Sequence, residues 1–293
     1  MKYILIASLS MVVFSLHAQT SNEDALKDKM QKELTAVINA SPSVVGLAVM
    51  DLVSNETFFV NEQRTFTQAS AIKIPILMEV FRQVQAGKIA LTDQKQVTTA
   101  NRVGGSGILQ QLQDPVSISL RDLCTLMITQ SDNTATNIVI STVGMDNVNK
   151  TMEELGCTNT KLQRYMMDTA AAAQGRENLS TPAEAVKILS LLYQGKFISA
   201  ALSDQVIAVL KKNARTGSRI AASLPAQVPI AFKPGALMTV STEWAIVYLN
   251  KRPYAMAVME NGRVPSDKSE TMEKLSKIVY NYFVHITKSG NEK

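Results

Sequence analysis

The chain has 293 residues, of which 46% are hydrophobic and 19% are charged, and its formal net charge at pH 7 is +5. This composition excludes a disordered protein and is sufficient for one large domain or two closely joined ones. The basic residues are scattered, with no run longer than a pair, so the charge does not indicate a surface that binds nucleic acid.

Residues 1–18 have the pattern of a secretory signal peptide. Lys2 is followed by an apolar stretch from Tyr3 to Leu16 and then by small residues, and we predict cleavage after Ala18. The apolar stretch is shorter than the roughly 20 residues that a membrane-spanning helix needs. The sequence therefore predicts a periplasmic or secreted protein with no stable membrane insertion after cleavage.

The remaining chain predicts an α+β fold. An amphipathic helix begins near Leu26, and two β-rich runs follow as a hairpin, "SVVGLAVMDL" and "TFFV". From residue 70 to about 215 the patterns are mostly helical, and several start at Ser, Thr or Asp and end at glycine. Strands return with "VPIAFKPGA", "WAIVYL" and "YAMAVME", and a helix closes the chain.

This order of elements predicts two lobes. Residues 19–66 and 222–293 would form one antiparallel sheet flanked by the terminal helices, and residues 67–221 would form an all-helical lobe. The active site is expected in the cleft between the lobes, where binding sites commonly lie.

The counts of histidine and cysteine limit the chemistry. After the predicted cleavage His285 is the only histidine, and a packing or surface role on the last helix is the simpler interpretation. Cys124 and Cys157 are the only cysteines, and the sequence leaves open whether they pair. A histidine-rich metal site is excluded and the cysteine ligands are too few, so we expect no metal.

The stretch "TQASAIKIPILMEVF" places Lys73 inside an apolar run. Pro75 is tolerated in the first turn of a helix, so a helix should begin near residue 71 with Ser70 at its N-terminal end. Lys73 would lie one turn on and face Ser70. Since no histidine is available, a lysine with a lowered pKa is a candidate base for a nucleophilic serine. Alone the pattern is weak, because a capping serine beside a surface-reaching lysine looks the same.

Two further motifs strengthen this interpretation. "ITQSDNTATN" supplies Ser131, Asp132 and Asn133, and "AFKPGAL" supplies Lys233 and Gly235 on a late strand. With Ser-x-x-Lys before them, these motifs resemble the signature set of class A β-lactamases and penicillin-binding proteins, the third in altered form. The resemblance covers nearly all of the chain after the signal peptide and implies a β-lactamase/transpeptidase-like fold.

The resemblance also implies catalytic roles, and it implies that no cofactor is needed. Ser70 would attack the substrate carbonyl and form an acyl-enzyme, and Lys73 would take or relay the serine proton. Lys233 would lower the pKa of Lys73 through its charge, and Ser131 would pass a proton to the departing nitrogen. Substrate would be bound by Asn133, Gly235 and the backbone N–H group of Ala236, which would form the oxyanion hole with that of Ser70.

The loop "LQRYMMDTAAAAQGREN" departs from the family pattern. Arg164 matches, but Met166 stands where class A enzymes have a glutamate and Ala170 where they have an asparagine. In the family these two side chains hold the water that cleaves the acyl-enzyme. Asp168 is a substitute deacylation base if the loop is shaped differently, although a salt bridge with Arg164 or a helix cap explains it equally well. Glu177 is a poorer candidate.

The late strand departs as well. Pro234 replaces a serine or threonine that would hold a substrate carboxylate, and proline fits only an edge strand. Trp244 lies near the place of the usual carboxylate-binding arginine. Arg219 matches a position where some relatives place a substitute arginine, and a solvated surface arginine is the alternative.

Three functions are therefore open. The first is an exported hydrolase of the class A β-lactamase family that opens β-lactam amides, with slow deacylation. The second is a D,D-peptidase or esterase-type penicillin-binding enzyme that acts on D-Ala-D-Ala-type peptides and is inhibited by β-lactams. The third is a non-catalytic module that binds β-lactams or peptidoglycan, against which the complete nucleophile-and-base set argues. In each case we expect a small-molecule substrate or ligand and a monomer.

Overall fold

The structure is a computed structural model that describes residues 23–262 and 269–289. The signal peptide expected at residues 1–18 lies outside the described residues. Within the part of the chain that is described, no helix combines the length and the apolar character needed to cross a bilayer.

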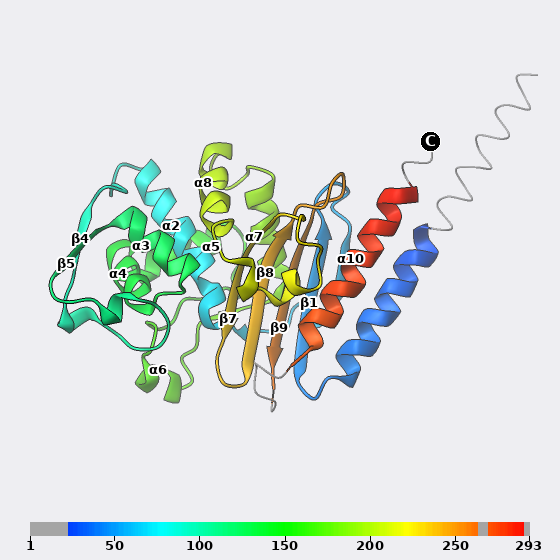
Figure 1. Cartoon of the computed structure of the whole chain (residues 1–293), viewed down its shortest axis with the longest axis horizontal. Coiled ribbons are helices and arrows are strands. Elements are labelled where there is room, and N and C mark those ends of the chain that lie inside the picture. Colours follow the sequence, from blue (N-terminus) through cyan, green and yellow to red (C-terminus); the bar gives the residue numbers. More distant parts are fainter. Residues whose placement is uncertain (1–22, 263–268, 290–293) are drawn as a thin grey trace, which may run out of the picture.

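A five-stranded antiparallel sheet forms the centre of one lobe (Figure 1). Its order, β2-β1-β9-β8-β7, places strands from the two ends of the chain side by side. These strands agree with the runs predicted from the sequence. Their bounds are β1 Val44–Asp51, β2 Thr57–Val60, β7 Ile230–Ala236, β8 Val240–Val247 and β9 Tyr254–Asn261.

Both faces of this sheet are covered, which explains why its central strands are apolar almost throughout. Side chains alternate between the faces. One face, with Trp244 and Ala257, packs against the helical lobe. The other face, with Ala245 and Val258, packs against the helix over residues 23–40 and against the C-terminal helix. That last helix is α10, Thr271–Ser289, and it lies beside the N-terminal helix (Figure 1).

The helical lobe surrounds α2, which is buried along most of its length. Several of its helices begin at the predicted kind of cap: the side chains of Ser119, Asp132, Thr181 and Ser199 each accept a backbone N–H three residues on. The helices are α2 Lys73–Gln85, α3 Leu120–Thr129, α4 Asn133–Val143, α5 Met145–Glu154, α6 Thr169–Ala173, α7 Pro182–Tyr193, α8 Ala200–Leu210 and α9 Arg219–Ala222.

Two short ribbons, which helical spacing did not indicate, accompany these helices. β4 (Gln94–Val97) pairs with β5 (Val116–Ser119), and β3 (Phe66–Thr67) pairs with β6 (Leu179–Ser180). They are too short to produce a clear alternating pattern, so the sequence was interpreted as helical across this region.

The two cysteines are separate. Cys124 and Cys157 are both free thiols and both buried. Burial raises the pKa of each thiol to about 12, which keeps them protonated and unreactive at neutral pH. The pairing left open by the sequence does not occur in this structure.

We expect Leu34→Ala to destabilise the protein by about 2–5 kcal/mol, because a fully buried side chain is removed from the core beneath the terminal helices. Urea unfolding would measure the change. The exposed Lys32→Ala on the same helix is the control and should shift stability by less than about 0.5 kcal/mol. A loss below that level for Leu34→Ala would contradict the described packing of this helix.

Candidate active site

Ser70 lies in η1 (Ala69–Ile72), a 3₁₀ turn that leads directly into α2. The helix thus begins within two residues of the predicted position, and Pro75 falls in its first turn, as expected. Ala69 has φ +45°, an unfavourable backbone conformation for a residue with a side chain. The strand β7 passes very close to this turn, since a Cβ added at Gly235 would lie 2.7 Å from the backbone nitrogen of Ser70.

Lys73 is fully buried and all of its hydrogen bonds go to one neighbouring turn. Its Nζ donates to the Ser131 carbonyl (2.7 Å), to Ser131 Oγ (3.1 Å) and to Asn133 Oδ1 (3.2 Å). The amine therefore reaches the Ser-Asp-Asn motif, as the sequence predicted. No hydrogen bond joins Lys73 to Ser70 among the described residues, so the expected direct contact is not formed here. Catalytic hydrogen bonds often form fully only around a bound substrate.

Ser131 connects the two buried lysines. Its Oγ accepts from Lys73 Nζ and also from Lys233 Nζ at 3.2 Å. Lys233, on β7, is 1% exposed and also donates to the Pro234 carbonyl at 3.0 Å. Ser131 has φ +49°, which turns the chain sharply between α3 and α4.

Burial sets the protonation of both lysines. It lowers the pKa of Lys73 well below the usual lysine value, and the charge of Lys233 lowers it further, while Asp132 acts in the opposite direction. Burial also lowers the pKa of Lys233 to about 7, against an opposing effect of the Glu243 carboxylate. A neutral amine is therefore accessible near neutral pH.

Asp132 and Asn133 fasten a glycine-rich loop, residues 103–109, to the site. Asp132 Oδ2 accepts the backbone N–H groups of Ile108 (2.7 Å) and Leu109 (2.9 Å), and its Oδ1 caps α4. Asn133 Nδ2 donates to the Gly104 carbonyl at 3.1 Å while its oxygen holds Lys73. These two side chains thus link the loop to the lysine.

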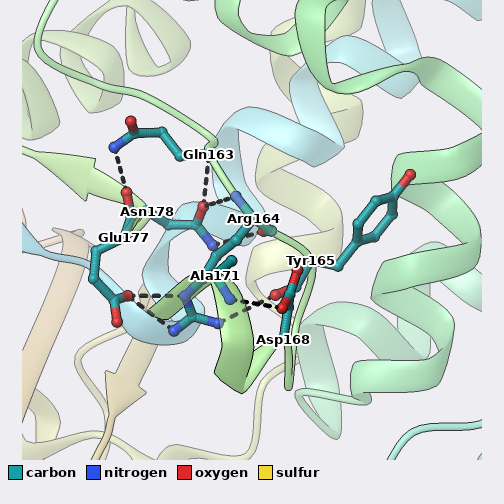
Figure 2. A network of polar contacts seen from close by, with 7 residues as sticks. All are labelled: Gln163, Arg164, Tyr165, Asp168, Ala171, Glu177 and Asn178. Carbon is teal, nitrogen blue, oxygen red and sulfur yellow. Dashed lines mark hydrogen bonds and ion pairs between the residues drawn. The ribbon is translucent and has the colours of Figure 1, made fainter. Parts of the chain in front are cut away.

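The loop that carries Met166 is held by a polar network (Figure 2). Arg164 forms an ion pair with Glu177, with Nε and one terminal nitrogen at 3.0 and 2.9 Å from the same oxygen. Asn178 accepts the backbone N–H groups of Gln163 and Arg164 and donates to the Arg164 carbonyl. Glu177 is therefore the partner of Arg164, and the carboxylate of Asp168 is not.

Asp168 caps α6 instead, accepting the Ala171 N–H at 2.9 Å (Figure 2). Of the alternatives for this residue, the helix cap is the contact that forms. Asp168 nevertheless lines the same cavity as Ser70, and so does Met166. The backbone of Met166 is fixed on both sides by the Asn137 amide, at 2.8 and 3.0 Å.

Two adjoining cavities share Ser70, Ser106 and Ala236. The smaller, about 270 Å³, brings together most of the predicted site residues: Ser70, Ser131, Lys233, Gly235, Ala236 and Arg219. The larger, about 700 Å³, holds Asn133 and Asp168 together with an apolar set: Met166, Met167, Leu237 and Met238. Except for Lys73, which is buried behind them and lines neither cavity, the predicted residues thus line one cleft between the sheet edge and the helical lobe.

The edge position predicted for Pro234 is correct, since β7 is the last strand of the sheet. Trp244 is fully buried, and its Nε1 donates to Gln68 Oε1 at 3.0 Å, away from the cleft. Arg219 lines the smaller cavity, and its guanidinium donates to the Ser269 carbonyl at 2.6 Å.

Sequence reasoning missed Glu243, a buried carboxylate that lines the smaller cavity. Burial raises its pKa to about 7, opposed by hydrogen bonds from Ser218 and the start of α9 and by the charge of Lys233. One feature of the sequence could have indicated Glu243: it is the single acidic residue in "STEWAIV", a strand whose other members are all buried. Among the described residues, no three His, Cys, Asp or Glu side chains are grouped so that they could hold a metal ion.

Residues 29–283 match the sequence profile of the Beta-lactamase enzyme family. The chain belongs to this family. It is 25% identical to beta-lactamase CARB-3 of Pseudomonas aeruginosa, over 80% of this chain and 81% of the relative. It is 27% identical to an imipenem-hydrolyzing beta-lactamase of Enterobacter cloacae, over 73% and 75% of the two chains.

Solved structures of the Beta-lactamase enzyme family and of a penicillin-binding protein have the same fold. The beta-lactamase of Sphaerobacter thermophilus superposes with a TM-score of 0.80 at 29% identity, covering 87% of this chain and 97% of the other. PBP-A gives 0.80 at 25% identity, with 88% and 96% covered. A mutant of PBP-A has been solved as an acyl-enzyme complex with penicillin G. The predicted class A β-lactamase-like family and the predicted fold are confirmed.

We expect Gly107→Ala to cost about 1–3 kcal/mol, because its φ of +110° is strained for alanine and the new Cβ would collide with the Asp132 side chain. Thermal and urea unfolding would measure the loss. Gly87→Ala is the matched control, since Gly87 also has positive φ (+67°) but no atom within 4 Å of the new Cβ. Equal losses for the two variants would contradict the close contact of the loop with Asp132.

Proposed function

We propose that this protein is a serine hydrolase that opens β-lactam amides through an acyl-enzyme on Ser70. The observation that carries the proposal is the position of the Ser131 hydroxyl, which accepts from two buried lysines and shares a cavity wall with Ser70. A non-catalytic binding module would have no use for two buried amines of lowered pKa. The third function considered above is therefore not favoured.

In the proposed reaction Lys73, as the neutral amine, takes the Ser70 proton while Oγ bonds to the substrate carbonyl carbon. The backbone N–H groups of Ser70 and Ala236 stabilise the negative oxygen that develops. The carbon–nitrogen bond of the amide then breaks. The proton passes from Lys73 through the Ser131 hydroxyl to the departing nitrogen, and the hydrogen bonds of Ser131 to both amines support this path.

Deacylation lacks an equivalent base. Met166 cannot accept a proton, Glu177 is committed to Arg164, and Asp168 is engaged in capping α6. Asp168 and Glu177 both line the cavity of Ser70, and we retain Asp168 as the candidate deacylation base because Glu177 is in an ion pair with Arg164. We infer that water cleaves the acyl-enzyme slowly.

The second candidate is a D,D-peptidase or esterase that β-lactams trap. The same missing glutamate favours it, and so does the likeness to PBP-A at 25% identity. For either candidate we propose export, on the pattern of residues 1–18, and a monomer. N-terminal sequencing of protein recovered outside the cytoplasm would test cleavage after Ala18.

We expect one equivalent of penicillin G or of a chromogenic cephalosporin to form an adduct within seconds to minutes and to remain bound much longer. Intact-mass spectrometry would show the adduct, and colour would show whether turnover continues. Ser70→Ala should give no adduct, while the neighbouring Ser106→Ala should still give one. Rapid steady turnover would contradict slow deacylation, and an adduct on the Ser70→Ala variant would contradict the assigned nucleophile.

We expect Met166→Glu to shorten the adduct lifetime by about tenfold or more, because it places a carboxylate in the cavity of Ser70. The decay of the adduct mass over time would measure this. Met167→Glu is the matched control: Met167 lines the same cavity, but it is 48% exposed whereas Met166 is 7% exposed, so a carboxylate at position 167 should be solvated and have little effect. An unchanged lifetime in Met166→Glu would mean that this loop cannot position a base.

A further inference from the structure

Glu243 lines the smaller cavity and accepts hydrogen bonds from a group of converging donors. It lies on β8, opposite Pro234 of the edge strand, and is 1% exposed. One carboxylate oxygen accepts from Ser218 Oγ, and the other accepts the backbone N–H groups of Arg219 (2.9 Å) and Ile220 (3.3 Å). A hydroxyl and two converging N–H groups are the kind of donors that bind a carboxylate. In this protein the Glu243 carboxylate already accepts the hydrogen bonds of these donors.

The same carboxylate compensates the charge of Lys233. Lys233 and Glu243 come from neighbouring strands and line one cavity. Each acts on the other electrostatically: Glu243 raises the pKa of Lys233, and Lys233 lowers the pKa of Glu243. A substrate anion approaching Lys233 would therefore meet the ionised Glu243 carboxylate as well as the ammonium at pH values above about 7, where Glu243 has lost its proton.

Other charged groups also lie near Glu243. Arg219 on α9 lines the same cavity and keeps its positive charge there: its guanidinium donates to the neutral Ser269 carbonyl, and its backbone N–H donates to Glu243. Glu260, on the same face of the neighbouring strand β9, is 3% exposed and accepts from Ser269 Oγ. It adds a second negative charge to this side of the sheet.

We propose that Glu243 makes this end of the cleft select acyl donors that are uncharged on the leaving-group side and disfavour those that carry a carboxylate there. The inference rests on the proposed acyl transfer by Ser70 and names the substrate class of that site: neutral amides or esters. β-Lactam acids would still acylate Ser70, but more slowly than their uncharged esters.

The experiment compares penicillin G with its methyl ester, which differ only at the carboxyl group. Second-order acylation constants are measured by intact mass, and each is divided by the rate of hydrolysis of the same compound in buffer, which removes intrinsic reactivity. In the wild-type protein the ester should acylate faster than the acid. The corrected acylation constant of the acid divided by that of the ester is the ratio of acid to ester. In Glu243→Gln this ratio should rise by about tenfold or more, the size of effect expected when a buried like charge is removed.

Glu184→Gln is the matched control. Glu184 is also a buried carboxylate (8% exposed) held by several hydrogen bonds, but it accepts from Asn159 and Thr160 and lines neither cavity of the cleft. Its ratio of acid to ester should equal that of the wild type. A wild-type preference for the acid, or a ratio unchanged by Glu243→Gln, would overturn the assignment.

A measurement on the wild type alone covers the case in which Glu243→Gln does not fold. Lowering the pH through about 7 protonates both Glu243 and Lys233, so the site becomes more positive and the ratio of acid to ester should rise. The carboxylate of penicillin stays ionised across this range. A ratio that is flat between pH 5.5 and 8.5 would refute the role of Glu243. Failure of both compounds to acylate Ser70 would instead refute the proposed function, and this inference with it.

Discussion

Two buried ammonium groups that share one hydroxyl are the constraint on which this site depends. Lys73 and Lys233 are almost wholly removed from water, and both donate to Ser131 Oγ, at 3.1 and 3.2 Å. Burying one charged amine is costly, and a second positive charge close by increases the cost. The fold therefore favours a state in which one amine has lost its proton. A neutral amine beside a serine is a base, and this chemistry needs no histidine.

The surrounding fold maintains this arrangement at the expense of local backbone strain. Ala69 and Ser131 both have positive φ, +45° and +49°, which typically costs about 1–3 kcal/mol for each such residue. Rigid neighbours hold both turns. The backbone of Gly235 lies against the Ser70 turn, and Asp132 caps α4 while binding the loop at Ile108. The strained residues are thus Ala69, next to the proposed nucleophile Ser70, and Ser131, whose hydroxyl lies between the two lysines. Both positions need precise placement.

The sequence predicted what depends on local pattern and failed where tertiary contacts decide. The helix at Ser70, the edge strand of Pro234 and the antiparallel sheet follow from turn chemistry and periodicity. The partner of Arg164 does not, because the sequence offered Asp168 for this ion pair and only the folded loop brings Glu177 to Arg164. Glu243 was missed because its partners lie 23 to 25 residues earlier and meet it only after α9 packs on the sheet.

The two halves of the proposed reaction belong to different parts of the structure. The proposed acylation groups stand on η1, α2, the α3–α4 turn and β7, and hydrogen bonds join the last three of these elements. The deacylation groups of related enzymes would stand on the loop around Met166, whose carboxylates are engaged in an ion pair and a helix cap. Changes in such a loop need not disturb the buried lysines. A chain can therefore keep the proposed first step intact while losing the second, and this separation is the physical basis of the slow deacylation proposed for this protein.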